Sequence, residues 1–145
     1  MEPIRVIFAD NHPLIRKAWK FILSQDLRFS LIGECDTGEQ AIELALRLYP
    51  DIVIMDVHLQ GMSGIEVTWH IKKNCPDVKV IGLSFDKKPE FLEKMFKAGA
   101  TGYLTKISGP EEIFKAIVEV QQGKMFICKE MSIFNQSEIN KMKGN

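Results

Sequence analysis

The sequence predicts a doubly wound α/β fold, in which a parallel sheet carries helices on both of its faces. Short runs rich in β-branched residues alternate with longer segments in which apolar residues recur at helical spacing. Several of the short runs are apolar throughout, as strands buried on both faces of a sheet must be. The chain has 145 residues, 46% of them hydrophobic, which is enough for one domain with a core of its own.

A strand comes first in each repeating unit of this pattern. The expected strands span residues 4–10, 29–35, 51–56, 79–84 and 102–106, and the expected helices span residues 13–24, 39–49, 64–74, 89–98 and 111–122. Pro13, Pro89 and Pro110 stand near helix starts, where a missing N–H costs little, and Gly99 and Gly123 follow helix ends. Ligands of a doubly wound fold bind at the carboxyl ends of the strands, so the strand ends are the first place to look for a site.

The rest of the chain indicates where the protein works. Residues 124–128 read as a candidate short strand, and residues 124–145 as a linker or tail. Nineteen basic residues balance nineteen acidic ones, so no overall field attracts nucleic acid or an anionic membrane. The first residues lack the features of a signal peptide, and no apolar run reaches transmembrane length. Cys35, Cys75 and Cys128 are odd in number and contain no CxxC pair. We expect a cytoplasmic protein with reduced thiols and no membrane partner.

Polar residues mark four of the predicted strand ends. Asp10 and Asn11 end the first strand, Asp56 the third, Ser84 the fourth and Lys106 the fifth. Taken singly, each has an ordinary structural interpretation as a helix cap, a turn residue or a solvated lysine. Structural roles of this kind do not explain why two acids, a hydroxyl and an ammonium stand at the same end of one parallel sheet. The combination indicates a functional site.

These residue types fit phosphoryl transfer. Oxygen ligands from Asp10, Asn11 and Asp56 suit a magnesium ion that keeps several waters. A metal there would offset the repulsion between the carboxylates and screen the phosphoryl oxygens from Asp56, the nucleophile. Lys106 adds a point charge and Ser84 a hydroxyl donor for the remaining oxygens.

Four segments of the chain carry a family resemblance: ADNHPLIR at residues 9–16, DIVIMDVH at 51–58, GMSGIE at 61–66 and AGATGYLTK at 98–106. Together they resemble the receiver domain of two-component response regulators of the NarL/FixJ (LuxR-type) family, over residues 4 to about 123. The resemblance implies a flavodoxin-like sheet of five strands in the order 2-1-3-4-5, with a receiver domain over residues 1–123.

The resemblance also implies how the site works. A sensor histidine kinase would phosphorylate Asp56 beside Mg²⁺ or Mn²⁺, and His58 would offer its backbone carbonyl to the metal. Ser84 and Tyr103 would report the event, the hydroxyl moving to the phosphate and the ring turning inward. Apart from its own phosphorylation and dephosphorylation, such a domain catalyses nothing. A second copy of the chain is a further candidate partner.

Three residues depart from the family pattern. Asn11 stands where most receivers have a second carboxylate, which predicts weak metal binding because an amide oxygen carries no charge. Gln60 replaces a common proline in the loop after Asp56, so that loop is expected to be less rigid. Phe85 replaces a small residue beside the pocket; it either restricts access or leans on its neighbours. The lone ring of His58 is not expected to be a ligand.

Several alternatives remain open. Family members usually continue into a DNA-binding helix-turn-helix domain, and the residues after Gly123 are too few for one, so this is an excised receiver or a stand-alone regulator. A receiver that signals by protein binding without phosphorylation is the main alternative. A flavin module would need phosphate-binding donors after the first strand, where Asp10 would repel an anion. A haloacid-dehalogenase-type phosphatase would carry its nucleophile on the first strand, followed by an acid two residues later, whereas His12 stands there.

Overall fold

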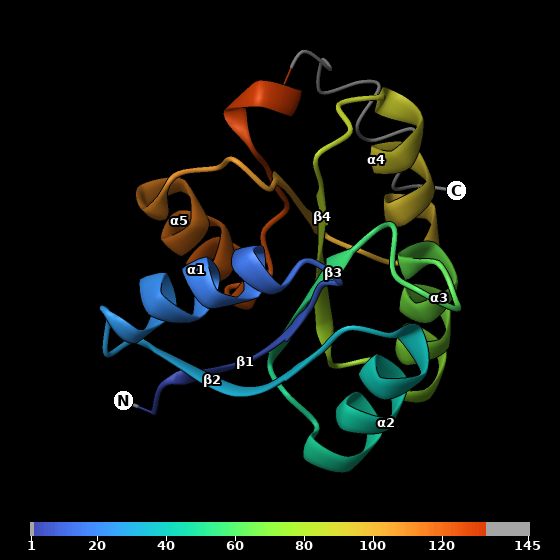
Figure 1. Ribbon diagram of the computed structural model, residues 1–145, viewed down its shortest axis with the longest axis horizontal. Coiled ribbons are helices and arrows are strands. Elements are labelled where there is room, and N and C mark those ends of the chain that lie inside the picture. Colours follow the sequence, from blue (N-terminus) through green and yellow to red (C-terminus); the bar gives the residue numbers. More distant parts are fainter. Residues whose placement is uncertain (1, 133–145) are drawn as a thin grey trace.

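The computed structural model describes residues 2–132 and consists of a sheet with helices on both sides (Figure 1). The strands are β1 (Ile4–Ala9), β2 (Phe29–Cys35), β3 (Ile52–Asp56), β4 (Lys79–Ser84), β5 (Gly102–Thr105) and β6 (Phe126–Ile127). The helices are α1 (Pro13–Ser24), α2 (Gly38–Leu48), α3 (Gly64–Asn74), α4 (Pro89–Ala98) and α5 (Pro110–Gln121), and a 3₁₀ turn, η1, spans Lys129–Met131.

The strand order is β2-β1-β3-β4-β5-β6, and all neighbouring pairs are parallel. The predicted doubly wound order 2-1-3-4-5 is therefore confirmed, and the sheet has a sixth, two-residue strand within residues 124–128, the candidate short strand. The sixth strand forms because Gly102 and Tyr103 of β5 pair with Phe126 and Ile127, which gives β5 a neighbour on its outer side. The predicted linker reaches beyond this strand into residues 133–145, which lie outside the described residues.

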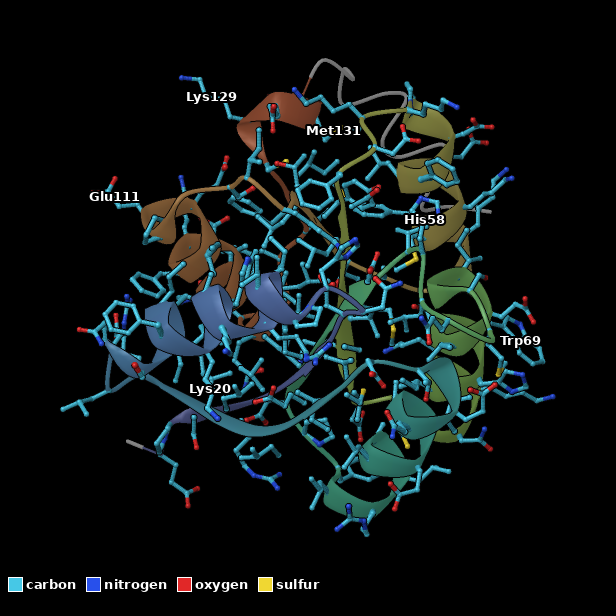
Figure 2. All side chains as sticks on the ribbon, in the orientation of Figure 1. Lys20, His58, Trp69, Glu111, Lys129 and Met131 are labelled. Atoms are coloured by element: carbon cyan, nitrogen blue, oxygen red, sulfur yellow. The ribbon has the colours of Figure 1, made fainter. Side chains whose placement is uncertain are left out.

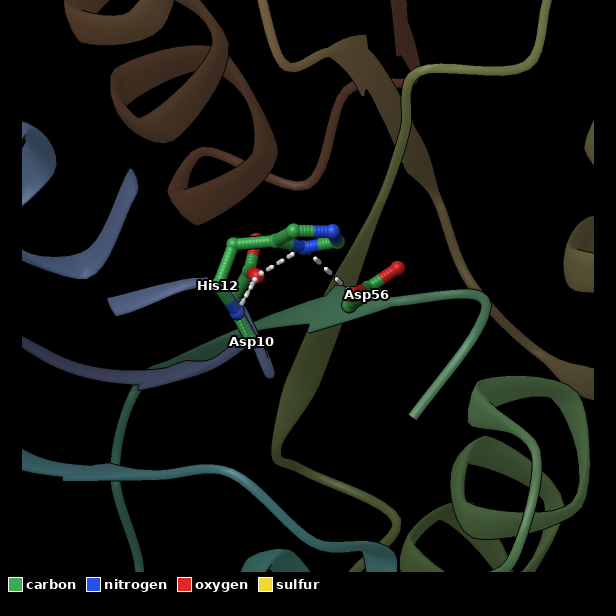
Figure 3. A group of neighbouring side chains, drawn as sticks. All are labelled: Asp10, His12 and Asp56. Carbon is green, nitrogen blue, oxygen red and sulfur yellow. Dashed lines mark hydrogen bonds and ion pairs between the residues drawn. The ribbon is translucent and has the colours of Figure 1, made fainter. Parts of the chain in front are cut away.

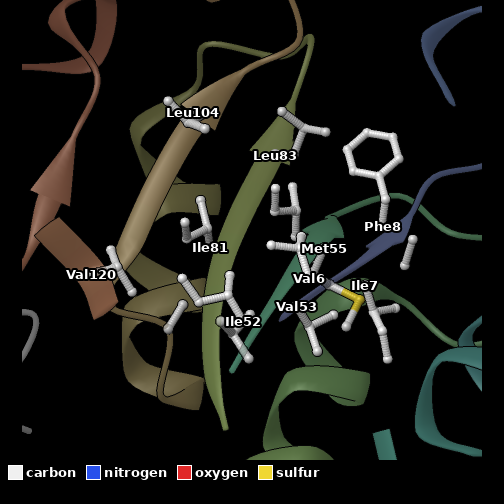
Figure 4. Packing of buried hydrophobic residues seen from close by; sticks show 14 of the residues in the cluster. Val6, Ile7, Phe8, Ile52, Val53, Met55, Ile81, Leu83, Leu104 and Val120 are labelled. Atoms are coloured by element: carbon white, nitrogen blue, oxygen red, sulfur yellow. The ribbon is translucent and has the colours of Figure 1, made fainter. Parts of the chain in front are cut away.

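The helices form two layers around the sheet. Figure 1 shows α1 and α5 on one side of the sheet and α2, α3 and α4 on the other. Every residue of β3 is buried, as expected of a central strand covered on both faces. Side chains on both faces of the sheet are buried: Ile52, Ile81 and Leu83 lie on one face and Val53 and Met55 on the other, and all belong to the core (Figure 4).

Short sequence signals fix where the helices begin and end. Pro13, Pro89 and Pro110 are the first residues of α1, α4 and α5. Gly99 ends α4 with a φ of 117°, a left-handed conformation that a residue with a Cβ rarely adopts. Within the described residues the longest helices, α1 and α5, have 12 residues each, which is too short to cross a membrane.

Candidate functional site

The register of the sheet brings the polar strand ends together. Ala9 is paired with Met55, so Asp10 and Asp56 follow side by side at the ends of β1 and β3. Ser84 is paired with Thr105, so Lys106 comes one residue beyond β5 at the same edge. Asp10, Asp56, Ser84 and Lys106 therefore lie at one edge of the sheet because of their positions at the ends of parallel strands.

Lys106 lies between the two carboxylates. Its Nζ donates to Asp56 Oδ2 at 2.9 Å and to Asp10 Oδ1 at 3.0 Å. The side chains of Asp10, Asp56 and Lys106 are at most 1% exposed, so water does little to screen this group. Two buried carboxylates this close together need a cation, and Lys106 supplies one positive charge. One of the two negative charges remains uncompensated.

His12 is a third partner of Lys106. Its Nδ1 lies 2.7 Å from Lys106 Nζ and 3.0 Å from Asp10 Oδ1, and Figure 3 shows the ring above both carboxylates. An ammonium has three N–H donors, and Asp10, Asp56 and the lone pair of Nδ1 can accept all three when the ring proton is on Nε2. His12 was not among the predicted site residues. Its position follows from a turn in which Asp10 Oδ1 accepts from the His12 backbone N–H at 2.7 Å. Aspartate side chains often bond to the backbone two residues on, so the sequence did contain a signal for this turn.

Two oxygen atoms at the site have no hydrogen-bond partner among the described residues. They are Asp10 Oδ2 and Asn11 Oδ1, and both are buried. Lys106 Nζ lies 2.9 Å from Asp10 Oδ2, an electrostatic contact without hydrogen-bond geometry. Buried oxygens of this kind are the ligands that Mg²⁺ and Mn²⁺ prefer, so Asp10, Asn11 and Asp56 form a donor set that fits a hard divalent cation. The acidic cluster could therefore bind a metal ion.

The loop after β3 holds the other oxygen of Asp56. The His58 backbone N–H donates to Asp56 Oδ1 at 2.9 Å. The loop returns to α3 at Gly64, where a Cβ would meet the Asp56 carbonyl oxygen, so a glycine is required for this close approach. The His58 ring is exposed and packs edge-on against Phe91 of α4, with ring centroids 4.7 Å apart (Figure 2).

Ser84 and Tyr103 are both fully buried near this edge of the sheet. Ser84 Oγ accepts from the Asp86 N–H at 2.9 Å, and the Ser84 carbonyl accepts from the Lys106 N–H at 3.1 Å. The Tyr103 ring lies inward over Gly82, where an added Cβ would be 2.8 Å from the ring. Burial raises the pKa of Tyr103, and its hydroxyl has no hydrogen-bond partner within the described part of the chain.

Phe85 covers one side of the site. Its ring centroid is 5.1 Å from Lys106 Nζ, a cation–π distance, and 5.6 Å from the His12 ring, which meets it edge-on. The side chain is 51% exposed, so it stands between Lys106 and solvent. The sequence left two interpretations of Phe85 open, restricted access to the pocket and packing on neighbouring side chains. They are compatible, because the ring packs on His12 and Lys106 and thereby covers one side of Lys106.

Comparison with known proteins assigns this arrangement to a family. The model of the response regulator receiver domain matches residues 6–118, most of the described fold. The chain belongs to the response regulator receiver domain family. The receiver is 34% identical over 129 residues to the response regulator GacA of Pseudomonas aeruginosa, covering 89% of this chain and 60% of GacA. It is 32% identical over 124 residues to the transcriptional regulatory protein DegU of Brevibacillus brevis, covering 86% of this chain and 52% of DegU.

A solved structure shares the whole fold of the receiver. A two-component response regulator of the LuxR family from Aurantimonas sp. SI85-9A1 superimposes with a TM-score of 0.86 at 28% identity, covering 99% of both chains. The chain is thus a receiver domain of two-component signal transduction, as the four sequence segments indicated. It spans 60% of GacA and 52% of DegU, so part of each relative has no counterpart in this chain.

Proposed function

We propose that Asp56 is the phosphoacceptor of this receiver and takes its phosphoryl group from a sensor histidine kinase. The observation that carries the proposal is the buried triad of Asp10, Asp56 and Lys106, in which Lys106 Nζ lies 2.9 Å from Asp56 Oδ2. Asp56 ends β3 and presents its carboxylate at the edge of the sheet where ligands of this fold bind. The functional receiver unit would comprise residues 1–123, as expected from the sequence, together with β6 and η1, because β6 pairs with β5 and Cys128 and Met131 are buried.

A divalent cation, Mg²⁺ or Mn²⁺, would bind through Asp10, Asn11, Asp56 and the backbone carbonyl of His58. The buried oxygens of Asp10 and Asn11 that lack hydrogen bonds support this ligand set. Charge supports it as well: the two carboxylates exceed the one ammonium by one negative charge, and the phosphoryl group of an arriving donor brings about two more. When bound, the cation would neutralise charge on the phosphoryl oxygens.

The chemical step needs little beyond position and charge. A carboxylate oxygen of Asp56 would bond to phosphorus while the bond from phosphorus to the donor's imidazole nitrogen breaks, and that nitrogen keeps the electron pair. Lys106, which donates to Asp56 Oδ2, would turn its N–H toward a phosphoryl oxygen. The His58 N–H would keep the carboxylate in place from the other side. The receiver would catalyse only this transfer and the later loss of the phosphoryl group.

Ser84 and Tyr103 would carry the change away from Asp56. Movement of the Ser84 hydroxyl toward the phosphoryl group would disturb its bond to the Asp86 N–H, at the start of the loop into α4. Tyr103 already packs inward over Gly82 of β4, so phosphorylation would hold the ring in this position rather than turn it inward. The face of α4 and β5 would then carry the output, through a two-state shift of these residues.

The partners follow from the family and the relatives. DegU is named a transcriptional regulatory protein, and the chain covers only 52% of it. We propose that this receiver controls transcription in the cytoplasm through a DNA-binding helix-turn-helix domain that is not among these 145 residues, and that a second copy of the chain is a partner.

Intact-mass measurement after incubation with acetyl phosphate tests the proposal. With Mg²⁺ the protein should gain the mass of one phosphoryl group, and EDTA should prevent the gain. The Asp56→Asn variant should gain nothing under the same conditions. A wild-type protein that binds Mg²⁺ yet gains no mass would instead support a receiver that signals by binding alone.

A further inference from the structure

The chain after α5 folds back onto the switch region as a strap, defined here as residues 126–131. Phe126 and Ile127 pair with β5, and the Cys128 N–H donates to the Tyr103 carbonyl at 3.0 Å. Cys128 and Met131 are at most 1% exposed, so the strap contributes to the core. Figure 2 shows Met131 and Lys129 on η1, beyond the end of β5. The strap is thus attached directly to the strand that carries Tyr103.

Glu130 makes a second attachment. Its Oε1 accepts from Thr105 Oγ1 at 2.6 Å, and its Oε2 lies 2.6 Å from Lys87 Nζ. Thr105 precedes Lys106 and is buried, whereas Lys87 is 58% exposed in the loop between β4 and α4. One carboxylate therefore joins three separate parts of the chain: the strap, the end of β5 and the loop that follows Ser84. The Lys87 ammonium and the Thr105 hydroxyl hold the pKa of Glu130 below its usual value.

The loop that carries Lys87 is organised by Ser84. Ser84 Oγ accepts from the Asp86 N–H at 2.9 Å, and Asp86 Oδ1 accepts from the Lys88 N–H at 2.9 Å. Lys87 is held between these two turns. A shift of the Ser84 hydroxyl toward a phosphoryl group would break the first of them and release one restraint on the backbone next to Lys87.

We propose that the strap is a latch that opens when Asp56 is phosphorylated, with Glu130 as the positioning residue that holds it closed. This inference rests on the proposed function and specifies its regulation. The path runs through direct contacts: Ser84 bonds to Asp86, the adjoining Lys87 pairs with Glu130, and Glu130 belongs to η1. The exposed ion pair is the weakest of these contacts and breaks first, because water and salt screen exposed charges. The strap then loosens from β5.

The reaction of Cys128 with iodoacetamide measures whether the latch is open. Cys128 is fully buried under the strap, and burial raises its pKa, so alkylation requires opening. Beryllofluoride with Mg²⁺, a mimic of the phosphoryl group, should speed alkylation of Cys128 roughly two- to fivefold, the range expected for loss of an exposed ion pair. Cys35 and Cys75 are buried elsewhere in the same molecule and should keep their rates, which peptide mapping reads separately.

Variants of the latch sharpen the test. Glu130→Gln keeps an acceptor for Thr105 but loses the charge that attracts Lys87, so Cys128 should react faster without the mimic and respond less to it. Glu43→Gln removes a similar 2.9 Å ion pair with Arg47 on α2, away from the strap, and should change neither rate. Exchanging the charges, Lys87→Glu with Glu130→Lys, should make the reaction slower than in either single variant, because opposite charges face each other again although Thr105 Oγ1 loses its acceptor.

The controls separate this inference from the proposed function. Amide exchange at residues 56–59 and 84–88 shows independently whether the mimic binds. If those amides respond while the Cys128 rate stays constant, the latch is refuted and Asp56 keeps its role. If neither responds, both the proposed function and the latch that rests on it are refuted.

Discussion

Replacement of Lys106 tests the charge balance of the site most severely. In the wild-type chain both Asp10 and Asp56 accept a hydrogen bond from Lys106 Nζ. Lys106→Met keeps the length of the aliphatic side chain but leaves these two carboxylates buried together without a cation. Asp56→Asn does the reverse, because it leaves one carboxylate facing one ammonium. The two variants therefore change the free energy of unfolding to very different extents.

The structure sets the sizes of these effects. All three side chains are at most 1% exposed, so Lys106→Met should cost about 3–5 kcal/mol, the range for removing one partner of a buried ion pair. Asp56→Asn loses one charge-assisted bond but relieves the repulsion from Asp10, and should remain within about 1 kcal/mol of wild type. Adding Asp56→Asn to Lys106→Met should recover much of the lost stability, because neighbouring groups are not additive.

Urea unfolding at pH 7 in EDTA gives these free energies directly. Lys97→Met is the matched control: Lys97 is 51% exposed and pairs with Glu93 on α4, so its loss should cost less than about 1 kcal/mol. Adding Mg²⁺ should stabilise Lys106→Met more than wild type, because the cation replaces the missing charge. The reasoning is refuted if Lys106→Met costs no more than Lys97→Met, or if Asp56→Asn is the more damaging of the two site variants.

Three further variants test separate features of the site. Asn11→Asp should bind Mg²⁺ roughly tenfold more tightly in a titration, because it adds a charged ligand; unchanged or weaker binding would remove Asn11 from the ligand set. Phe85→Ala should speed both phosphorylation by acetyl phosphate and loss of the phosphoryl group, measured by intact mass over time, because the ring no longer covers Lys106. Gly82→Ala should cost about 1–3 kcal/mol in urea unfolding and raise the exposure of Tyr103 in near-ultraviolet spectra, since the new Cβ would be 2.8 Å from the ring; an unchanged spectrum would show that Met95 yields instead.

Much of the fold was predictable because periodicity and helix boundary residues act locally. The ranges of β2, β4, α1, α3 and α4 agree with the prediction at both ends. β6 was harder to predict as a strand, because two residues show no alternation and pair only once β5 is in place. Its formation depends on contacts between distant parts of the sequence.

The site was predictable to the extent that strand ends determine it. Asp10, Asp56 and Lys106 come together because parallel strands end at one edge, which sequence position alone implies. The contacts of His12 depend on the turn at Asp10 and on a side-chain rotamer, and those of Glu130 depend on a loop and a strap that are far apart in sequence. Such contacts leave no periodic pattern.

Locating the phosphoryl group within the sequence tests the central claim most directly. After reaction with acetyl phosphate and Mg²⁺, borohydride reduces an acyl phosphate to an alcohol, and tandem mass spectrometry of the peptides identifies the reduced residue. We predict reduction at Asp56 alone, with none when Mg²⁺ is withheld. Reduction at Asp10 or at another carboxylate, with Asp56 intact, would contradict the assignment of Asp56 as the phosphoacceptor.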